Sequence, residues 1–153
     1  MTLAVIVLLV FLTASTGAIF KPGAWYESLD RPGWTPPNWA FPVVWTLLYV
    51  MIAAAGYLVY SAQGLGIAIL LWGAQLVVNA MWSWLFFGLK RMDLALIDIG
   101  ALLASILAFM VTAFPVSPLA AALFLPYAAW VALAGFLNYR MIQLNPSQAV
   151  GGA

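Results

Sequence analysis

The sequence contains no cysteine and no histidine, and few charged side chains of either sign. It therefore offers no thiolate nucleophile, no imidazole base and none of the commonest ligands of zinc and haem iron. A Ser-His-Asp relay is excluded, and so is a nucleotide-driven pump, because no glycine-rich phosphate loop precedes a lysine. We expect no metal site, no required cofactor and no nucleic-acid partner.

Charged residues are also too few to cover a surface that faces water. They make up 6% of the 153 residues, against 67% hydrophobic residues, whereas a soluble domain carries roughly a quarter charged residues. Apolar runs of about 20 residues are typical of transmembrane helices. Five such runs are present, at Thr2–Phe20, Phe41–Ala62, Gly66–Leu89, Met92–Phe114 and Leu119–Ile142.

These runs predict an all-α integral membrane protein that forms a single domain over residues 1–153. The last four runs are joined by short connections, which make neighbouring helices antiparallel. The first run lacks the basic residues that open a secretory signal peptide, so we interpret it as a helix of the domain. The sequence thus predicts a bundle of five transmembrane helices with one long loop, residues 21–40, after the first helix.

The basic residues indicate how this bundle is oriented. In a five-helix bundle, every lysine and arginine falls on the face that holds loop 21–40, the connection at residues 90–91 and the C-terminal end. The positive-inside rule places that face in the cytoplasm, and an all-helical fold favours the bacterial inner membrane over the outer one. The basic residues are Lys21, Arg31, Lys90, Arg91 and Arg140.

The long loop and the start of the second helix are rich in tryptophan and proline. The segment Trp25–Tyr49 holds four residues of each kind. Prolines fix the backbone in a non-helical path, and indoles offer large flat faces. We interpret this segment as a rigid aromatic lid over a flat, apolar ligand; anchoring in an interfacial aromatic belt is the alternative.

Polar and aromatic residues in the third and fifth runs outline a candidate pocket. In the third run they recur at spacings of three and four and therefore share one helix face. Asn79 lies near the middle of that run and needs a hydrogen-bond partner, either another helix or a buried ligand. The fifth run repeats Trp130, Ala134 and Asn138 every four residues. The stripe in the third run consists of Trp72, Gln75, Asn79, Trp82 and Phe86.

A carboxylate within the fourth run, Asp98, is a functional candidate because ionisable groups are costly in a membrane. It also lies seven residues after Arg91, on roughly the same helix face. We therefore expect Asp98 to form a hydrogen bond inside the bundle or to reach toward the basic pair at residues 90–91.

Small residues mark a second face of the third run. Gly66, Gly73 and Ala80 recur every seven residues, away from the stripe that contains Asn79. Small residues at this period allow two helices to approach closely. We expect this face to form a homodimer interface within the lipid bilayer.

Three ordered blocks of the sequence resemble the translocator protein family (TspO). They lie in the loop with the second helix, in the third helix and in the fifth helix, so the resemblance covers nearly the whole chain. The blocks are Trp25-Tyr26 through Trp45-Thr46 with Tyr49, then Asn79 with Trp82 and Phe86-Phe87, and finally Leu125-Pro126-Tyr127 with Trp130, Ala134 and Leu137-Asn138-Tyr139.

The resemblance implies a membrane receptor or sensor that binds tetrapyrroles such as protoporphyrin IX, together with benzodiazepine-type ligands, in a five-helix bundle that is usually dimeric. The alternatives are a porphyrin transporter and an enzyme that degrades porphyrin in light, in which Trp45 and Trp130 would be catalytic. The positions that match the family's ligand pocket are Tyr26, Trp34, Trp45, Asn79, Trp82, Trp130 and Ala134.

The resemblance also divides the tryptophans of the lid. It assigns Trp45 to the pocket wall and Trp34 to its cover, and it leaves Trp25 and Trp39 as interfacial anchors.

Charge and metal preference follow from the same residues. Porphyrin propionates are expected to pair with Lys21 or Arg31 at the rim. Because the chain lacks histidine and cysteine, it has no good axial ligand for haem iron, and metal-free porphyrin is expected to bind at least as well as haem.

The sterol motif proposed for animal members of the family is incomplete in this chain. Tyr139 is followed directly by Arg140, without the spacer residues that the motif requires between them, which argues against sterol binding there.

Overall fold

The computed structural model describes residues 2–151, and all regular elements among them are helices. The only β-type pairing in this part of the chain is an isolated antiparallel bridge between Arg91 and Val150. The helices are α1 (Leu3–Ile19), α2 (Ala24–Glu27), α3 (Ala40–Gln63), α4 (Ile67–Ser83), the π-helical η1 (Trp84–Gly88), α5 (Met92–Ala113), α6 (Pro118–Leu123), α7 (Leu125–Leu144) and the 3₁₀-helical η2 (Pro146–Gln148).

Four helical segments are long and apolar enough to cross a membrane, and α1, with 17 residues, is apolar but shorter. The chain is therefore a multi-pass helical membrane protein. Each of the five predicted runs corresponds to one of these segments, with ends within two residues of the predicted ones. The four long segments are Ala40–Gln63, Ile67–Gly88, Met92–Ala113 and Pro118–Leu144.

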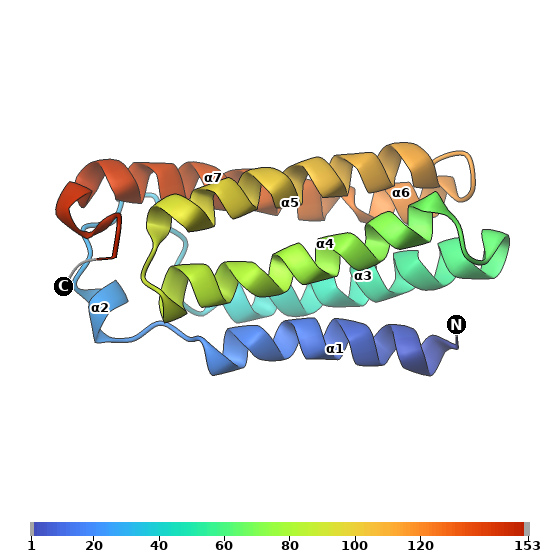
Figure 1. Cartoon of the computed structure of the whole chain (residues 1–153), viewed down its shortest axis with the longest axis horizontal. Coiled ribbons are helices and arrows are strands. Elements are labelled where there is room, and N and C mark those ends of the chain that lie inside the picture. Colours follow the sequence, from blue (N-terminus) through green and yellow to red (C-terminus); the bar gives the residue numbers. More distant parts are fainter. Residues whose placement is uncertain (1, 152–153) are drawn as a thin grey trace.

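The long helices lie side by side along the molecule (Figure 1). Loop 21–40, the turn between α4 and α5 and the C-terminal end all lie at one end, which we call the loop end. The predicted grouping of the basic residues is confirmed, because they belong to these segments. Helix α5 packs against α4 and α7, whereas α3 packs closely against α1, α4 and α6 but not against α7. The fifth span thus approaches α3 through α6, at the end away from the loop.

Buried side chains form two apolar clusters. The central cluster fills the space between the long helices, and its largest members include Trp72, Phe109, Phe124 and Tyr127. The loop-end cluster joins the loop to η1, α5 and α7, and Trp82 packs against both clusters. The buried members of the loop-end cluster are Tyr26, Leu29, Leu85, Phe86, Met92, Ala95, Leu137, Met141 and Ala149.

Two of the spans are irregular. The fifth span is interrupted at Phe124, two residues before Pro126, where a proline cannot donate the helical hydrogen bond to the preceding turn. The third span ends in the π-helical segment η1, in which the Leu89 N–H donates to the Trp84 carbonyl at 2.8 Å. The sequence did not predict this segment, and π turns are frequent at functional sites.

The loop is fastened to the bundle at its middle. Residues 24–27 form one helical turn, α2, ahead of the prolines, which the sequence did not predict. The Asp30 N–H then donates to Asn145 Oδ1 at 2.9 Å, and Asn145 Nδ2 donates to the Asp30 carbonyl at 2.8 Å. Asn145 also donates to the Met141 carbonyl at 2.9 Å. Asn145 therefore ties loop 21–40 to the C-terminal end of α7.

Candidate functional site

Aromatic rings bridge α3 and α7 at the loop end, where the two backbones do not pack closely. The Phe41 ring lies edge-on to Trp130 with centroids 5.6 Å apart. Trp45 stacks on Tyr49 at 5.4 Å and lies edge-on to Tyr127 at 6.1 Å. We call Phe41, Trp45, Tyr49 and Trp130, all of them half-buried, the aromatic seam. A mostly apolar wall with a few polar groups behind it is typical of a small-molecule site.

A network of buried polar side chains lies behind the seam. Asn79 Nδ2 donates to the Tyr127 hydroxyl at 2.6 Å, and that hydroxyl donates to Gln75 Oε1 at 2.9 Å. The Tyr49 hydroxyl donates to Asn79 Oδ1 at 3.0 Å, and Gln75 Nε2 donates to the Trp72 carbonyl at 2.9 Å. Asn79 therefore joins α3, α4 and α7, as the interhelical interpretation requires. Its contact with a ligand stays a prediction.

A second aromatic group fills the loop-end cluster. Trp82 stacks on Phe86 at 5.2 Å, and Tyr26 from α2 lies edge-on to Phe87 at 5.6 Å and to Phe86 at 6.2 Å. Tyr26 is 6% exposed, so α2 is packed firmly onto the end of the third span. The interpretation of Trp25 as an interfacial anchor is wrong: its ring packs edge-on to Phe86 at 5.8 Å and its indole Nε1 is buried.

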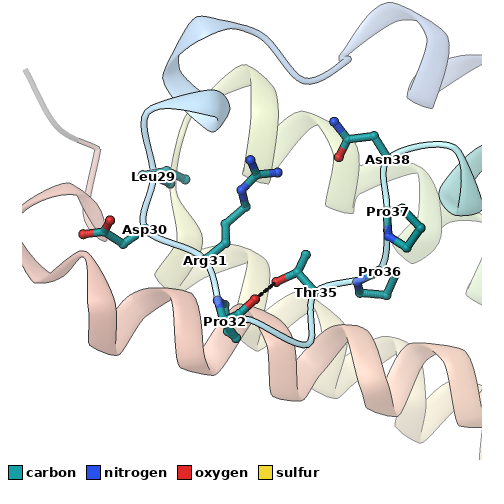
Figure 2. A pocket seen from close by; sticks show the side chains of 8 residues that line it. All are labelled: Leu29, Asp30, Arg31, Pro32, Thr35, Pro36, Pro37 and Asn38. Carbon is teal, nitrogen blue, oxygen red and sulfur yellow. Dashed lines mark hydrogen bonds between the residues drawn. The ribbon is translucent and has the colours of Figure 1, made fainter.

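The proline segment of the loop lines an open polar cavity of about 540 Å³ at the surface. Figure 2 shows the side chains of Arg31, Thr35 and Asn38 pointing into the curve of the loop, whereas Asp30 points away. The Arg31 guanidinium lies 5.1 Å from the centroid of the Tyr26 ring, at cation–π distance. Within residues 2–151 the only ion pair joins Arg91 and Asp93, so the charge of Arg31 is available to an anion. The cavity is lined by Leu29, Asp30, Arg31, Pro32, Thr35, Pro36, Pro37 and Asn38.

Trp34 lies apart from the other predicted ligand residues. It stacks on Phe136 with centroids 5.4 Å apart and an interplanar angle of 14°. Both side chains are exposed, by 45% and 55%, so Trp34 covers the outer face of α7 and not the seam. Trp39 is 70% exposed, and its role as an interfacial anchor stays a prediction. The structure thus gathers Trp45, Asn79 and Trp130 around the seam, places Ala134 one turn after Trp130, and puts Tyr26 and Trp82 in the loop-end cluster.

The TspO/MBR family model matches residues 3–144. The chain belongs to the TspO/MBR family. It is 41% identical to Protein CrtK of Rhodobacter capsulatus, over 88% of this chain and 86% of that protein. It is 39% identical to the tryptophan-rich sensory protein of Cereibacter sphaeroides, over 86% and 84% of the two chains. It is 38% identical to the translocator protein of Bos taurus, over 83% and 78%.

Family membership confirms the resemblance seen in the sequence. This TspO/MBR protein is therefore related to membrane sensory and translocator proteins. Among the described residues, no group of three or more His, Cys, Asp or Glu side chains is placed to hold a metal ion.

Sequence reasoning missed the two tyrosines that complete the polar network. Tyr127 lies three residues before Trp130, one helical turn away, and this spacing was a signal that it shares the inward face. Tyr49 likewise lies four residues after Trp45. No local signal indicated Asn145, because its partner Asp30 is 115 residues away in the chain.

The expectation that Asp98 forms a hydrogen bond inside the bundle or reaches the basic pair is wrong in both parts among the described residues. Arg91 instead holds Asp93 with two hydrogen bonds, Nη2 to Oδ2 at 2.6 Å and Nε to Oδ1 at 2.8 Å. This bond raises the pKa of the Arg91 guanidinium. Asp98 is 7% exposed and its Oδ2 has no hydrogen-bond partner among the described residues. Asp98 is therefore a buried carboxyl that the fold itself does not use as an acceptor at Oδ2.

Proposed function

We propose that this TspO/MBR protein is a membrane receptor or sensor that binds a tetrapyrrole, such as protoporphyrin IX, at the aromatic seam beneath loop 21–40. The observation that carries the proposal is that indole and phenyl rings, without close backbone contact, join α3 to α7 at the loop end. Aromatic side chains can separate and stack again around a flat ligand at a lower free-energy cost than two closely packed backbones can. Light-dependent breakdown of the bound porphyrin would use the same two indoles, Trp45 and Trp130.

Charge at the loop end supports a ligand with acidic groups. The porphyrin macrocycle is flat and apolar, and its propionates are anionic. Arg31 points into the loop cavity without an ion-pair partner among the described residues, and Lys21 is exposed just after α1. A macrocycle against the seam with its propionates toward Arg31 satisfies both the apolar and the charged parts of the ligand.

We further propose that α1 makes a fifth membrane span. At 1.5 Å per residue, its 17 residues extend about 26 Å, close to the hydrocarbon thickness of about 30 Å. Five spans put the N-terminal end of α1 opposite the loop end, as in Figure 1. The basic residues then favour a cytoplasmic loop end in a bacterial inner membrane.

Replacing Trp130 by leucine is expected to weaken protoporphyrin IX binding about tenfold. An aromatic stack contributes about 0.5–1.5 kcal/mol beyond its buried area, leucine also buries less apolar surface against the macrocycle than an indole does, and 1.4 kcal/mol is a factor of ten in affinity. The measurement is a titration of the purified protein in nanodiscs, followed by the Soret absorbance of the porphyrin. Trp39→Leu is the matched control, because Trp39 is 70% exposed whereas Trp130 is half-buried. Equal losses in the two variants, or no saturable binding by the wild type, would contradict the proposal.

We also propose a homodimer through the outer face of α4. Gly73 and Ala80 line an apolar groove between α1 and α4, and open space surrounds a Cβ built at Gly73. Gly66 does not line this groove, and a Cβ there would meet the Gln63 side chain at 2.9 Å. Helices in lipid associate through such close approaches.

Cross-linking tests this dimer on a chain that has no cysteine of its own. Gly73→Cys and Ala80→Cys are each expected to give covalent dimers in lipid bilayers under mild oxidation. Gly100→Cys, at an open position on α5, is the control and should remain monomeric. Dimers from the control alone, or from none of the three variants, would exclude this interface.

A further inference from the structure

The second half of the loop, residues 30–39, which we call the crossing segment, runs from α7 to α3. Asp30 is hydrogen-bonded to Asn145 at the end of α7, and Trp34 stacks on Phe136 further along the same helix. Helix α3 begins directly after the segment. The aromatic seam joins the same two helices, whose backbones do not pack closely. The crossing segment therefore lies across the space between α3 and α7 at the loop end.

Asn145 fastens this segment with its side-chain amide. Apart from the first turn of α3, the hydrogen bonds that join the segment to the rest of the described chain are both made by Asn145. The Asp30 N–H donates to Oδ1 at 2.9 Å, and Nδ2 donates to the Asp30 carbonyl at 2.8 Å. Three residues of the segment are prolines, which have no N–H to donate. The N–H and the hydroxyl of Thr35 both donate to Pro32, within the segment.

Asn145 is itself held firmly by the bundle. It is 6% exposed, and both its backbone N–H and its Nδ2 donate to the Met141 carbonyl, at 3.0 and 2.9 Å. The chain that follows is held on the turn between α4 and α5, where the Asp93 N–H donates to the Ala149 carbonyl at 3.3 Å. Loss of the two bonds to Asp30 therefore frees the crossing segment and leaves the end of α7 in place.

We propose that the Asn145 amide holds the crossing segment closed over the aromatic seam, and that it thereby sets the rate at which a flat ligand enters and leaves. The inference rests on the proposed function, because it concerns access to the seam. Asn145 lies 15 residues after Trp130, about 22 Å along the helix, so its amide does not contact a ligand at the seam. Its loss accelerates entry and exit alike and leaves the affinity nearly unchanged.

The first test measures how often the loop lifts, and it needs no ligand. Leu29, the residue before the crossing segment, is 5% exposed, and the chain has no cysteine of its own. In Leu29→Cys, a water-soluble maleimide therefore reaches the thiol when the loop lifts. In nanodiscs, adding Asn145→Ala is expected to raise the labelling rate about tenfold, the factor that corresponds to about 1.4 kcal/mol of lost hydrogen bonding.

The second test measures ligand exchange in the chain that keeps Leu29. For Asn145→Ala in nanodiscs, the association and dissociation rates of protoporphyrin IX are both expected to rise about tenfold, the same factor as the labelling rate. The Kd is expected to change less than about threefold, because both rates depend on the same opening of the loop.

Two further variants separate the hydrogen bonds from other effects. Asp30→Ala is the matched control, because Asn145 bonds to backbone atoms of Asp30 and the Asp30 side chain points away from the loop cavity (Figure 2). Its labelling and exchange rates should stay within about twofold of the wild type. Asn145→Asp keeps the shape of the side chain but replaces the Nδ2 donor by an acceptor oxygen, and it should behave as Asn145→Ala does.

The outcomes distinguish this inference from the proposed function. Unchanged labelling in both Asn145 variants, or equal acceleration in Asp30→Ala, overturns the role of Asn145 and leaves the proposed function intact. Faster labelling without faster porphyrin exchange, or a larger change in Kd than in the rates, overturns its control of access. A wild-type protein that binds no protoporphyrin IX overturns the proposed function, and the labelling of Leu29→Cys then still decides whether Asn145 holds the loop closed.

Discussion

Tyr127→Phe is expected to lower the free energy of unfolding by about 2 kcal/mol while leaving the volume of the packed core almost unchanged. The change removes one hydroxyl, which accepts from Asn79 at 2.6 Å and donates to Gln75 at 2.9 Å. Tyr127 and Gln75 are 0% exposed and Asn79 is 4% exposed. Their orphaned amide groups therefore reach neither water nor headgroups, and each unpaired group costs about 1–3 kcal/mol.

Two effects keep the expected loss below the sum of these costs. Asn79 and Gln75 are one helical turn apart and recover part of the loss by bonding to each other. Single interhelical hydrogen bonds in membrane proteins also average only about 0.6 kcal/mol. Complete burial outweighs that average here, because neither water nor lipid headgroups reach the amides that lose their partner.

Reversible unfolding in mixed detergent micelles, followed by circular dichroism, measures the loss. Tyr57→Phe is the matched control: it removes the same atom from a tyrosine of α3 that is 44% exposed, and it should stay within about 0.5 kcal/mol of the wild type. If Tyr127→Phe is as stable as this control, the network does not hold the helices together.

Gly56→Ala is expected to destabilise the protein by about 2–3 kcal/mol, although alanine is the better helix former. A Cβ at Gly56 would lie 2.4 Å from Cε2 and 2.6 Å from Nε1 of Trp72. The indole cannot move away freely, since it is 1% exposed and its Nε1 donates to the Ile52 carbonyl at 2.8 Å. Overpacking costs about 1–3 kcal/mol, and the strained hydrogen bond adds to this. Together they exceed the gain of about 1 kcal/mol in helix propensity.

The matched control for this substitution is Gly100→Ala, at a helical position with open space around it. There only the propensity gain remains, so the same unfolding measurement should show unchanged or slightly higher stability. Trp72→Phe provides a second check, because a smaller ring leaves room for the added methyl. The double variant should lose less than the sum of the two single losses. Strict additivity would show that Trp72 does not make the close contact.

Gly56 and Tyr127 hold different helices together around the aromatic seam. Gly56 lets α3 and α4 approach until an indole of one helix contacts the backbone of the other. The hydrogen bonds of Tyr127 then tie α3 and α4 to α7, although the backbones of α3 and α7 are not in close contact. The rings of the aromatic seam lie between these two helices, and loop 21–40, fastened by Asn145, lies beside them. Rigid packing on one side of the seam and side-chain bridging on the other suit a site that admits a flat ligand.

The ends of the spans were predictable to within two residues because lipid imposes both a length and a composition on each helix. The stripe of Trp72, Gln75 and Asn79 was predictable too, since an amide in lipid must face the protein interior. Helix α2, the π turn of η1 and the packing of Trp25 were not predictable. Each depends on contacts with residues distant in the chain, and the local sequence reads equally well as loop, α-helix or interfacial anchor.

The sequence by itself determined that this is a helical membrane protein of the TspO/MBR family with its basic residues at one end. Scarce charge, long apolar runs and ordered tryptophan–proline motifs leave no other class open. Only the tertiary structure decided which aromatic residues share a site, that Trp34 lies on the outer face of α7, and that Asp98 is left without a cation. The physical reason is that buried and lipid-facing positions are equally apolar. Hydrophobicity therefore positions the helices along the membrane normal, whereas hydrogen bonds and close packing decide which faces meet.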